Sequence, residues 1–289
     1  MNPIAFTRQR LGRLRQSWRI RQQRRRNQAA LEQMRATGQP YFAAELRALL
    51  GCDDPWLAAA AQEYAACPAA WEHLSGLRSA GRATDGMAKS LDVAEGFALW
   101  ALVKHLRPRL VVELGVQYGI SARLWKEALT AYVPGHSLIL CDLEDHRRLI
   151  GDDEARFYRE DAATLLPRLF SSEQVDILHN DAHPYDLIRW SVEEAITHQV
   201  PCLTFHDVGR GPRNPFRLES QHLTQAEKTR QRVNWTQYGH WERHVMAELF
   251  SPDLLHQDTA QARGWRVQIF DSLFGFGAAL RQTDSSRRP

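Results

Sequence analysis

Two glycines follow a short apolar run in the middle of the chain. The run Leu-Val-Val-Glu-Leu occupies residues 110–114, Gly115 follows it directly, and Gly119 comes four residues later. Glycine tolerates unusual backbone angles and lets a ligand approach the main chain without meeting a Cβ. A dinucleotide-binding G-x-G-x-x-G turn would have its second and third glycines where this chain has Gln117 and Ile120, which disfavours NAD and FAD. The spacing predicts a strand, a binding turn and a helix.

Acids and histidines follow the other runs that read as strands. They are Asp142, Asp161, Asp181, His183, His206 and Asp207. Carboxylates accept hydrogen bonds from hydroxyl groups and bind divalent cations, and imidazole exchanges protons near neutral pH. These residue types suit a centre that binds a polar ligand and moves a proton. The four cysteines have no C-x-x-C spacing, so we expect free thiols and no structural zinc site.

Strand and helix patterns alternate between residues 110 and 205. Apolar runs at 110–114, 137–141, 175–178 and 201–205, with a shorter one at 157–158, are separated by helical patterns, and 265–270 and 274–280 predict a closing antiparallel pair. The pattern predicts an α/β fold with a doubly wound, mostly parallel, seven-stranded sheet. Such sheets bind ligands at the carboxyl ends of their strands, where these acids and histidines occur.

The N-terminal third has a different composition. Residues 28–84 are rich in Ala and Leu and predict a helical extension, and a further helix is expected up to Leu106. Residues 1–26 contain nine arginines and no acid. Removing these nine from the 37 Lys and Arg of the chain leaves 28 against 34 acids, so the remainder has a net charge of −6. We predict three parts: a basic tail or amphipathic helix (1–27), a helical extension (28–84) and the α/β domain (85–289).

The composition also excludes several classes of protein. With 44% hydrophobic and 25% charged residues the chain is of ordinary globular type, and no run approaches the ~18 apolar residues of a membrane span. No apolar segment of the kind found in secretory signals follows the arginines. We expect a cytoplasmic protein. Residues 1–27 are a solvated tail, an organellar transit peptide, or a peripheral anchor to an anionic membrane or an acidic partner.

Several segments resemble class I S-adenosylmethionine-dependent methyltransferases. V-V-E-L-G-V-Q-Y-G-I-S-A (111–122) resembles their motif I, and S-L-I-L-C-D looks like the second strand, whose acid receives the ribose hydroxyls. F-Y-R-E-D looks like the segment that borders the adenine. V-D-I-L-H-N-D-A-H-P-Y-D and C-L-T-F-H-D-V are similar to the fourth and fifth strands of the catechol O-methyltransferase-like branch. The resemblance covers 85–281 and implies that S-adenosylmethionine is held by Glu113, Gly115, Gln117, Gly119, Ser121, Asp142 and Asp161.

The resemblance also implies a reaction, the O-methylation of a hydroxyl group on a small molecule or glycan. His183 is the first choice for the base that removes the hydroxyl proton, and His206 and Asp181 are the other catalytic candidates. The catechol branch holds a divalent cation such as Mg²⁺ with an Asp after strand four and an Asp-Asn pair after strand five. Asp181 and Asp207 match this pattern, but Val208 replaces the Asn, so His183 or His206 would have to complete the site.

Other functions remain open at this stage. The protein could be a differently reacting or non-catalytic scaffold of the same fold, anchored by its Arg-rich N-terminus. Methylation of nucleic acid is disfavoured, because the body is acidic and N-D-A-H-P-Y replaces the N/D-P-P-Y/F motif. The Arg-rich stretch 210–232 with Trp235, Tyr238 and Trp241 suits an anionic acceptor, although Trp241 to Phe250 also reads as an ordinary packing helix.

Overall fold

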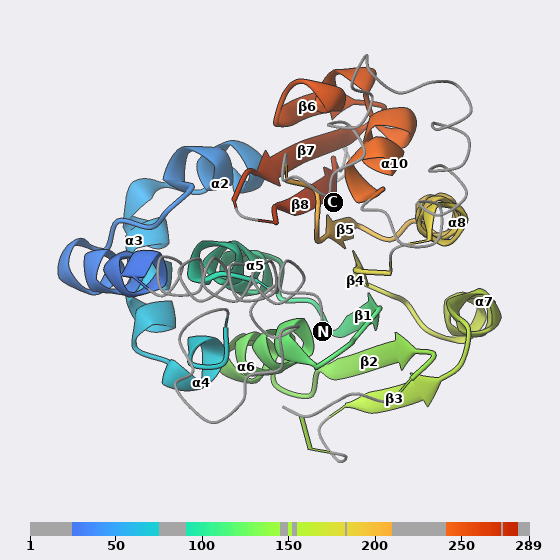
Figure 1. The fold of residues 1–289 in the computed structure, drawn as a ribbon, viewed down its shortest axis with the longest axis horizontal. Coiled ribbons are helices and arrows are strands. Elements are labelled where there is room, and N and C mark those ends of the chain that lie inside the picture. The colour runs from blue at the N-terminus through green and yellow to red at the C-terminus, as the bar shows by residue number, and fades with distance from the viewer. Residues whose placement is uncertain are drawn as a thin grey trace, which may run out of the picture.

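A single eight-stranded sheet forms the centre of the computed structural model, which describes residues 25–74, 91–144, 150–151, 155–182, 184–209, 241–272 and 274–282. The strands lie in the order β3-β2-β1-β4-β5-β8-β7-β6 (Figure 1). Their bounds are β1 Leu110–Leu114, β2 Ser137–Asp142, β3 Arg156–Arg159, β4 Ile177–Asn180, β5 Cys202–Phe205, β6 Thr259–Ala262, β7 Trp265–Phe270 and β8 Phe276–Arg281.

The first five strands are parallel, and the last three are antiparallel to their neighbours. The predicted doubly wound, mostly parallel sheet with its closing pair is therefore confirmed. The predicted number of seven strands is wrong, because β6 pairs with β7 as an additional edge strand. Its sequence Thr-Ala-Gln-Ala is short and only partly buried, so it lacks the apolar run that identifies the other strands.

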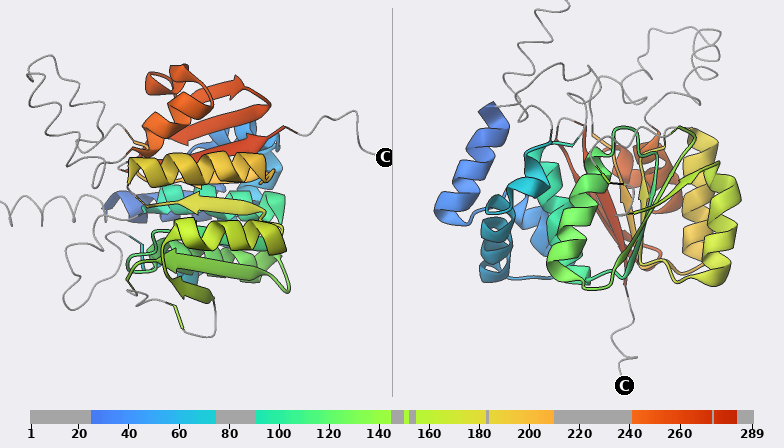
Figure 2. Two further views of the ribbon diagram at one scale, coloured as in Figure 1. Left: turned by 90° about the vertical axis from the view of Figure 1, so that its right-hand side faces the viewer. Right: turned by 90° about the horizontal axis from the view of Figure 1, so that it is seen from below.

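Helices cover both faces of the sheet (Figure 2). One face carries α5 (Val93–Leu106), α6 (Ile120–Tyr132) and α2 (Ala43–Leu50), which packs against β7, with α3 (Asp54–Ala65) and α4 (Pro68–Trp71) outside them. The other face carries α7 (Ala162–Ser172), α8 (Tyr185–Thr197) and α10 (Glu242–Leu249), which is followed by the 3-10 turn η3 (Pro252–Leu255). The expected packing helix is thus present as α10, whereas the Arg-rich stretch 210–232, Trp235 and Tyr238 lie outside the described residues.

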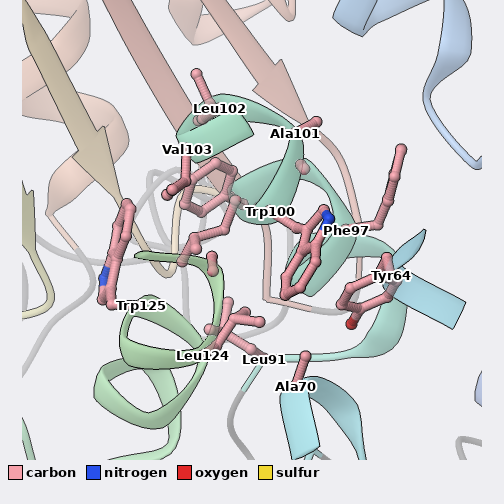
Figure 3. Packing of buried hydrophobic residues seen from close by; sticks show 14 of the residues in the cluster. Tyr64, Ala70, Leu91, Phe97, Trp100, Ala101, Leu102, Val103, Leu124 and Trp125 are labelled. Atoms are coloured by element: carbon pink, nitrogen blue, oxygen red, sulfur yellow. The ribbon is translucent and has the colours of Figure 1, made fainter. Parts of the chain in front are cut away.

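The helical extension shares its core with the α/β body. The ring of Tyr64 on α3 lies 5.8 Å from that of Phe97 and 5.6 Å from that of Trp100, both on α5 (Figure 3). At the surface, Lys104 Nζ donates to Glu63 Oε2 at 2.7 Å and joins the same two helices. The predicted boundary at residue 84 lies outside the described residues, but the described part of 28–84 packs as one body with α5.

The described chain begins with a helix over residues 25–37. Residues 1–24, which contain most of the arginines of the predicted basic tail, lie outside the described residues. None of the described helices combines the length and the apolar character that a membrane span requires.

Candidate active site

The turn between β1 and α6 is folded around one carboxylate. Asp142, the last residue of β2, accepts hydrogen bonds through Oδ2 from the backbone N–H groups of Val116 at 2.8 Å and Gln117 at 3.0 Å. Gln117 and Gly119 have φ values of 47° and 76°, in the left-handed region. From the end of the neighbouring strand β2, Asp142 therefore shapes the turn that the sequence predicts as the binding loop.

Gly115 is required by the approach of a neighbouring strand. It has φ 83°, and a Cβ there would lie 2.6 Å from the carbonyl carbon of Asp181 and 2.8 Å from the nitrogen of Ala182. The amide of Asp181 in turn donates to the carbonyl of Leu114 at 2.9 Å. The absence of a side chain at Gly115 thus brings the segment after β4 directly against the turn, and with it the side chain of Asp181.

Glu113 lies beneath the turn with no exposed surface. Its Oε1 accepts a hydrogen bond of 2.5 Å from the hydroxyl of Ser121, while its Oε2 has no hydrogen-bond partner among the described residues. Burial raises the pKa of Glu113 well above its usual range, and the nearby Asp181 and Asp142 add to this effect, although the Ser121 hydrogen bond opposes it. Buried polar atoms are rarely left without a partner, so Oε2 is an atom to which a further group could hydrogen-bond.

Asp161, the predicted adenine contact, caps a helix. It precedes α7, and its Oδ1 accepts from the N–H of Ala163 at 2.8 Å, as N-cap residues commonly do. Its side chain is exposed at the carboxyl end of β3, beside the strand that carries Asp142. The helix cap and a ligand contact are compatible, since each carboxylate oxygen accepts more than one hydrogen bond.

Three of the predicted catalytic and metal-binding side chains come together at the ends of β4 and β5. Donor atoms of Asp181, His206 and Asp207 all lie within 4.8 Å of one another. His206 Nδ1 is 3.2 Å from Asp181 Oδ1 and 3.8 Å from Asp207 Oδ1. Asp207 has φ 58°, a conformation that few residues other than glycine adopt and that occurs disproportionately at functional sites.

The state of His206 follows from this environment. Burial alone would lower its pKa, but the carboxylates of Asp207 and Asp181 outweigh burial and raise the pKa well above its usual range. The Nε2 atom of the ring is buried and has no hydrogen-bond partner among the described residues. The two carboxylates therefore favour the charged form of the ring, whose Nδ1 contacts Asp181 and whose Nε2 is available to another group.

Two further histidines lie close to these residues in the sequence. His183, the first choice for the base, lies outside the described residues. His179 is fully buried on β4, between Glu113 of β1 and Thr204 of β5, and its Nδ1 is 3.0 Å from the Thr204 hydroxyl. Burial lowers the pKa of His179 to about 4, so the ring is neutral. His179 therefore makes an internal contact within the sheet.

Two buried charged residues near this edge, Glu95 and Arg243, were not predicted from the sequence. Glu95 on α5 is fully buried and contributes to the raised pKa of His206. Arg243 on α10 is fully buried and donates to the carbonyl of Val208, directly after Asp207. The pattern Asp92-x-x-Glu95 could have identified a capping box, but no local pattern indicates that either side chain reaches the strand ends.

Acidic groups from five elements thus act on one edge of the sheet. Glu113 interacts electrostatically with Asp142 and Asp181. His206 interacts with Asp181, Asp207 and Glu95. The raised pKa of Glu113 favours its neutral form, so the negative charge of the set lies on the other four acids, and charge of one sign in a partly buried region attracts ligands of the opposite sign. The edge is therefore suited to a cationic ligand, a metal ion, or both.

Comparisons with known proteins give similarities of structure only. No family model matches the chain, and no curated protein sequence matches it. A methyltransferase of Podospora anserina, PaMTH1, bound to SAH, has 14% identity and a TM-score of 0.48 over 70% of this chain and 83% of its own. An O-methyltransferase from Bacillus cereus in complex with SAH has 14% identity and a TM-score of 0.48, over 84% of this chain and 98% of its own.

A third similar structure is TomG of Streptomyces achromogenes, an O-methyltransferase involved in tomaymycin synthesis, in complex with SAM. It has 15% identity and a TM-score of 0.45 over 68% of this chain and 83% of its own. Because all three share at most 15% of their residues with this chain and have TM-scores below 0.5, they do not identify its acceptor.

Proposed function

We propose that the protein is an S-adenosylmethionine-dependent O-methyltransferase acting on a hydroxyl group of a small molecule or glycan. The observation that carries the proposal is the acidic edge of the sheet around the glycine turn, with the buried Glu113 Oε2 atom left without a hydrogen-bond partner among the described residues. S-adenosylmethionine supplies a methyl group on a positively charged sulfonium and also carries an ammonium group. Both cations suit an edge that is rich in carboxylates.

The residues at the turn fit this cofactor. The unpartnered Oε2 of Glu113 provides an acceptor beneath the turn. Asp142 Oδ1 accepts only from the Glu144 N–H, at 3.1 Å, among the described hydrogen bonds, which leaves capacity for ribose hydroxyls. Gly115, Gln117, Gly119 and Ser121 would form the rest of the cradle. Asp161, two strands from the turn, would border the adenine.

The cluster of Asp181, His206 and Asp207 would bind the acceptor hydroxyl. His206 Nε2 is the polar atom of the cluster that the described residues leave without a partner, and we assign to it the contact with the acceptor oxygen. Asp181 fixes the ring through Nδ1. Such orientation of a reacting oxygen is a large part of what a methyltransferase must supply, because the sulfonium is already a reactive methyl donor.

A divalent cation is the second way in which the same cluster could act. Two carboxylates and the neutral form of the His206 imidazole, which would release a proton when the ion binds, would hold it, and the cation would lower the pKa of the acceptor hydroxyl. A nitrogen donor in the set suits Mn²⁺ or Zn²⁺ as well as the Mg²⁺ expected from the sequence. Incubation with a chelator distinguishes the two modes: full activity after chelation would exclude Asp181 and Asp207 as metal ligands.

The decisive experiment has two steps. Calorimetry with S-adenosylhomocysteine should give a dissociation constant in the micromolar range, and a folded protein that does not bind it would refute the cofactor assignment. Transfer of a labelled methyl group from the cofactor to a cell extract should then occur with the wild type, fall strongly in His206→Gln and persist in the control His198→Gln. Cofactor binding without any transfer would support the non-catalytic scaffold instead.

His198 is a suitable control because it lies at the end of α8, away from the carboxyl ends of the strands, and stacks on Phe170 with ring centroids 4.8 Å apart.

Two parts of the proposal extend beyond the described residues. His183 remains a candidate base, and residues 1–27 remain a candidate anchor to an anionic membrane or an acidic partner. Catalysis by the variant His183→Gln and flotation of the full chain with anionic vesicles test them separately.

A further inference from the structure

Glu95 makes more contacts than its position in a helix requires. It is the third residue of α5, and its Oε2 accepts from the N–H of Asp92 at 2.7 Å while Asp92 accepts from the N–H of Glu95, which together form a capping box. Its Oε1 bonds outside the helix: it accepts from the N–H of Gly275 at 2.8 Å and from the hydroxyl of Ser272. The capping box uses only Oε2, so the contacts of Oε1 are not part of the helix cap.

Gly275 connects Glu95 to the segment that follows β5. While the N–H of Gly275 donates to Glu95, its carbonyl accepts from the N–H of Val208 at 3.3 Å, and the N–H of Gly209 donates to the carbonyl of Phe274 at 2.6 Å. Gly275 has φ 86°, and a Cβ there would overlap the backbone of Gly209. The loop between β7 and β8 and the segment 207–209 are thus in direct backbone contact.

The geometry of His206 and Asp207 depends on this contact. The left-handed conformation of Asp207 is strained and persists only where the surrounding structure enforces it. The segment is held through Gly275 on one side, and the carbonyl of Val208 accepts from Arg243 Nη1 at 3.3 Å on the other. The ring of Phe274, beside Gly275, lies 5.9 Å from that of His206.

We infer that Glu95 is a positioning residue for the acceptor-side cluster: through Gly275 it fixes the backbone after β5 and hence the placement of the His206 and Asp207 side chains. The catalytic meaning of this inference rests on the proposed function, whereas its structural content does not. If Glu95 were only a helix cap, its removal would lower stability and leave His206 where it is.

Nitrogen NMR of protein labelled with ¹⁵N-histidine reports directly on His206, whose signals are assigned by their loss in His206→Gln. In Glu95→Ala, at constant pH, we expect the His206 signals to shift or broaden beyond the line width while those of the remote His136 stay in place. Ser272→Ala removes the hydroxyl that donates to Glu95 and that also accepts from the Gly275 N–H at 3.1 Å, but it leaves the bond from the Gly275 N–H to Glu95, so it should move the His206 signals less than Glu95→Ala does. Unchanged His206 signals in folded Glu95→Ala would overturn the inference.

A pair of glycine variants separates geometry from the charge of Glu95. Gly275→Ala retains the Glu95 carboxylate but displaces Gly209, so it should move the His206 signals as Glu95→Ala does. Gly264→Ala is the matched control, because Gly264 has a similar φ of 77° and a Cβ added there would meet no atom of the described residues within 4 Å. Equal effects of the two glycine variants on His206, or no effect of Gly275→Ala, would overturn the inference even if Glu95→Ala failed to fold.

Measurements of cofactor affinity by calorimetry and of methyl transfer distinguish failure of this inference from failure of the proposed function. Glu95 contacts none of the cofactor residues by a described hydrogen bond, so Glu95→Ala should bind S-adenosylhomocysteine within about twofold of the wild type while methyl transfer falls by about tenfold or more. A parallel loss of cofactor affinity would contradict a role confined to the acceptor side. A wild type that does not bind the cofactor would refute the proposed function, and the NMR comparison would still decide the role of Glu95.

Discussion

Asp176, which directly precedes β4, is a matched control for Asp142, which ends β2, because the two acids make the same kind of hydrogen bonds at opposite ends of the strands. Asp142 accepts from the backbone N–H groups of Val116, which is buried, and Gln117, which is exposed. Asp176 likewise accepts through one oxygen from Leu110, which is buried, at 3.0 Å, and from Arg109, which is exposed, at 2.7 Å. Both acids are half-buried, but only Asp142 lies at the proposed cofactor site.

The two alanine variants should therefore lose similar amounts of stability. In each, the exposed N–H turns to water and the buried one loses its acceptor, which costs about 1–3 kcal/mol. Urea unfolding without ligand should show this loss for both Asp142→Ala and Asp176→Ala. Only Asp142→Ala should also lose the ribose contact, worth another ~1–3 kcal/mol, which corresponds to a roughly 5- to 150-fold weaker binding of S-adenosylhomocysteine by calorimetry.

Similar affinities of the two variants would refute the ribose contact. If Asp142→Ala binds S-adenosylhomocysteine within twofold of Asp176→Ala, Asp142 only shapes the turn. Any loss of affinity that both variants share then comes from general destabilisation. Asp142→Asn should fall between the wild type and Asp142→Ala, because it keeps one acceptor oxygen for the turn.

Three further predictions concern stability. Gly96→Ala should destabilise the protein by ~1–3 kcal/mol in urea unfolding, although alanine raises helix propensity by ~1 kcal/mol, because the added Cβ would lie 2.5 Å from the Tyr64 hydroxyl oxygen. Adding Tyr64→Phe removes that oxygen and should recover part of the loss. If stability does not recover, the hydroxyl is not the obstacle. Burial alone would raise the pKa of Glu63, but its hydrogen bonds from Lys104 and Tyr132 outweigh burial and lower it. The advantage of the wild type over Glu63→Gln should thus be present above the unfolded-state pKa of Glu63 and disappear as the pH falls through the lowered folded-state pKa; a pH-independent difference would contradict this. Arg243→Met should cost ~3 kcal/mol or more in urea unfolding, because it removes a buried guanidinium that donates to three backbone carbonyls and one carboxylate, and a loss below ~1 kcal/mol would refute this role.

The sheet could be predicted because its central strands are apolar runs bounded by polar residues. The edge strand β6 could not, since an exposed edge imposes no apolar pattern on the chain. Burial, which the apolar pattern reports, is only partial in this strand.

The candidate site could be predicted to the extent that it follows from the ends of parallel strands. Such ends meet at one edge, so the residues after β4 and β5 were expected together, and Asp181, His206 and Asp207 are. Glu95 could not be predicted, because it comes from a helix 111 residues before His206 and its local pattern is already explained by the capping box. The sequence therefore predicts site residues that directly follow strands. It does not predict site residues on the helices that cover the sheet.

The placement of Glu95 also bears on the helical extension, whose purpose the sequence leaves open. Helix α5 carries Glu95 at its start and packs Phe97 and Trp100 against Tyr64 of the extension. A chain that begins at residue 85 would expose these aromatic rings and deprive α5 of its outer support, and through Glu95 the disturbance would reach His206. We expect such a truncation to be insoluble or to lack a cooperative unfolding transition by circular dichroism; a soluble, cooperatively folded product with unchanged cofactor binding would show that the extension is a separate unit.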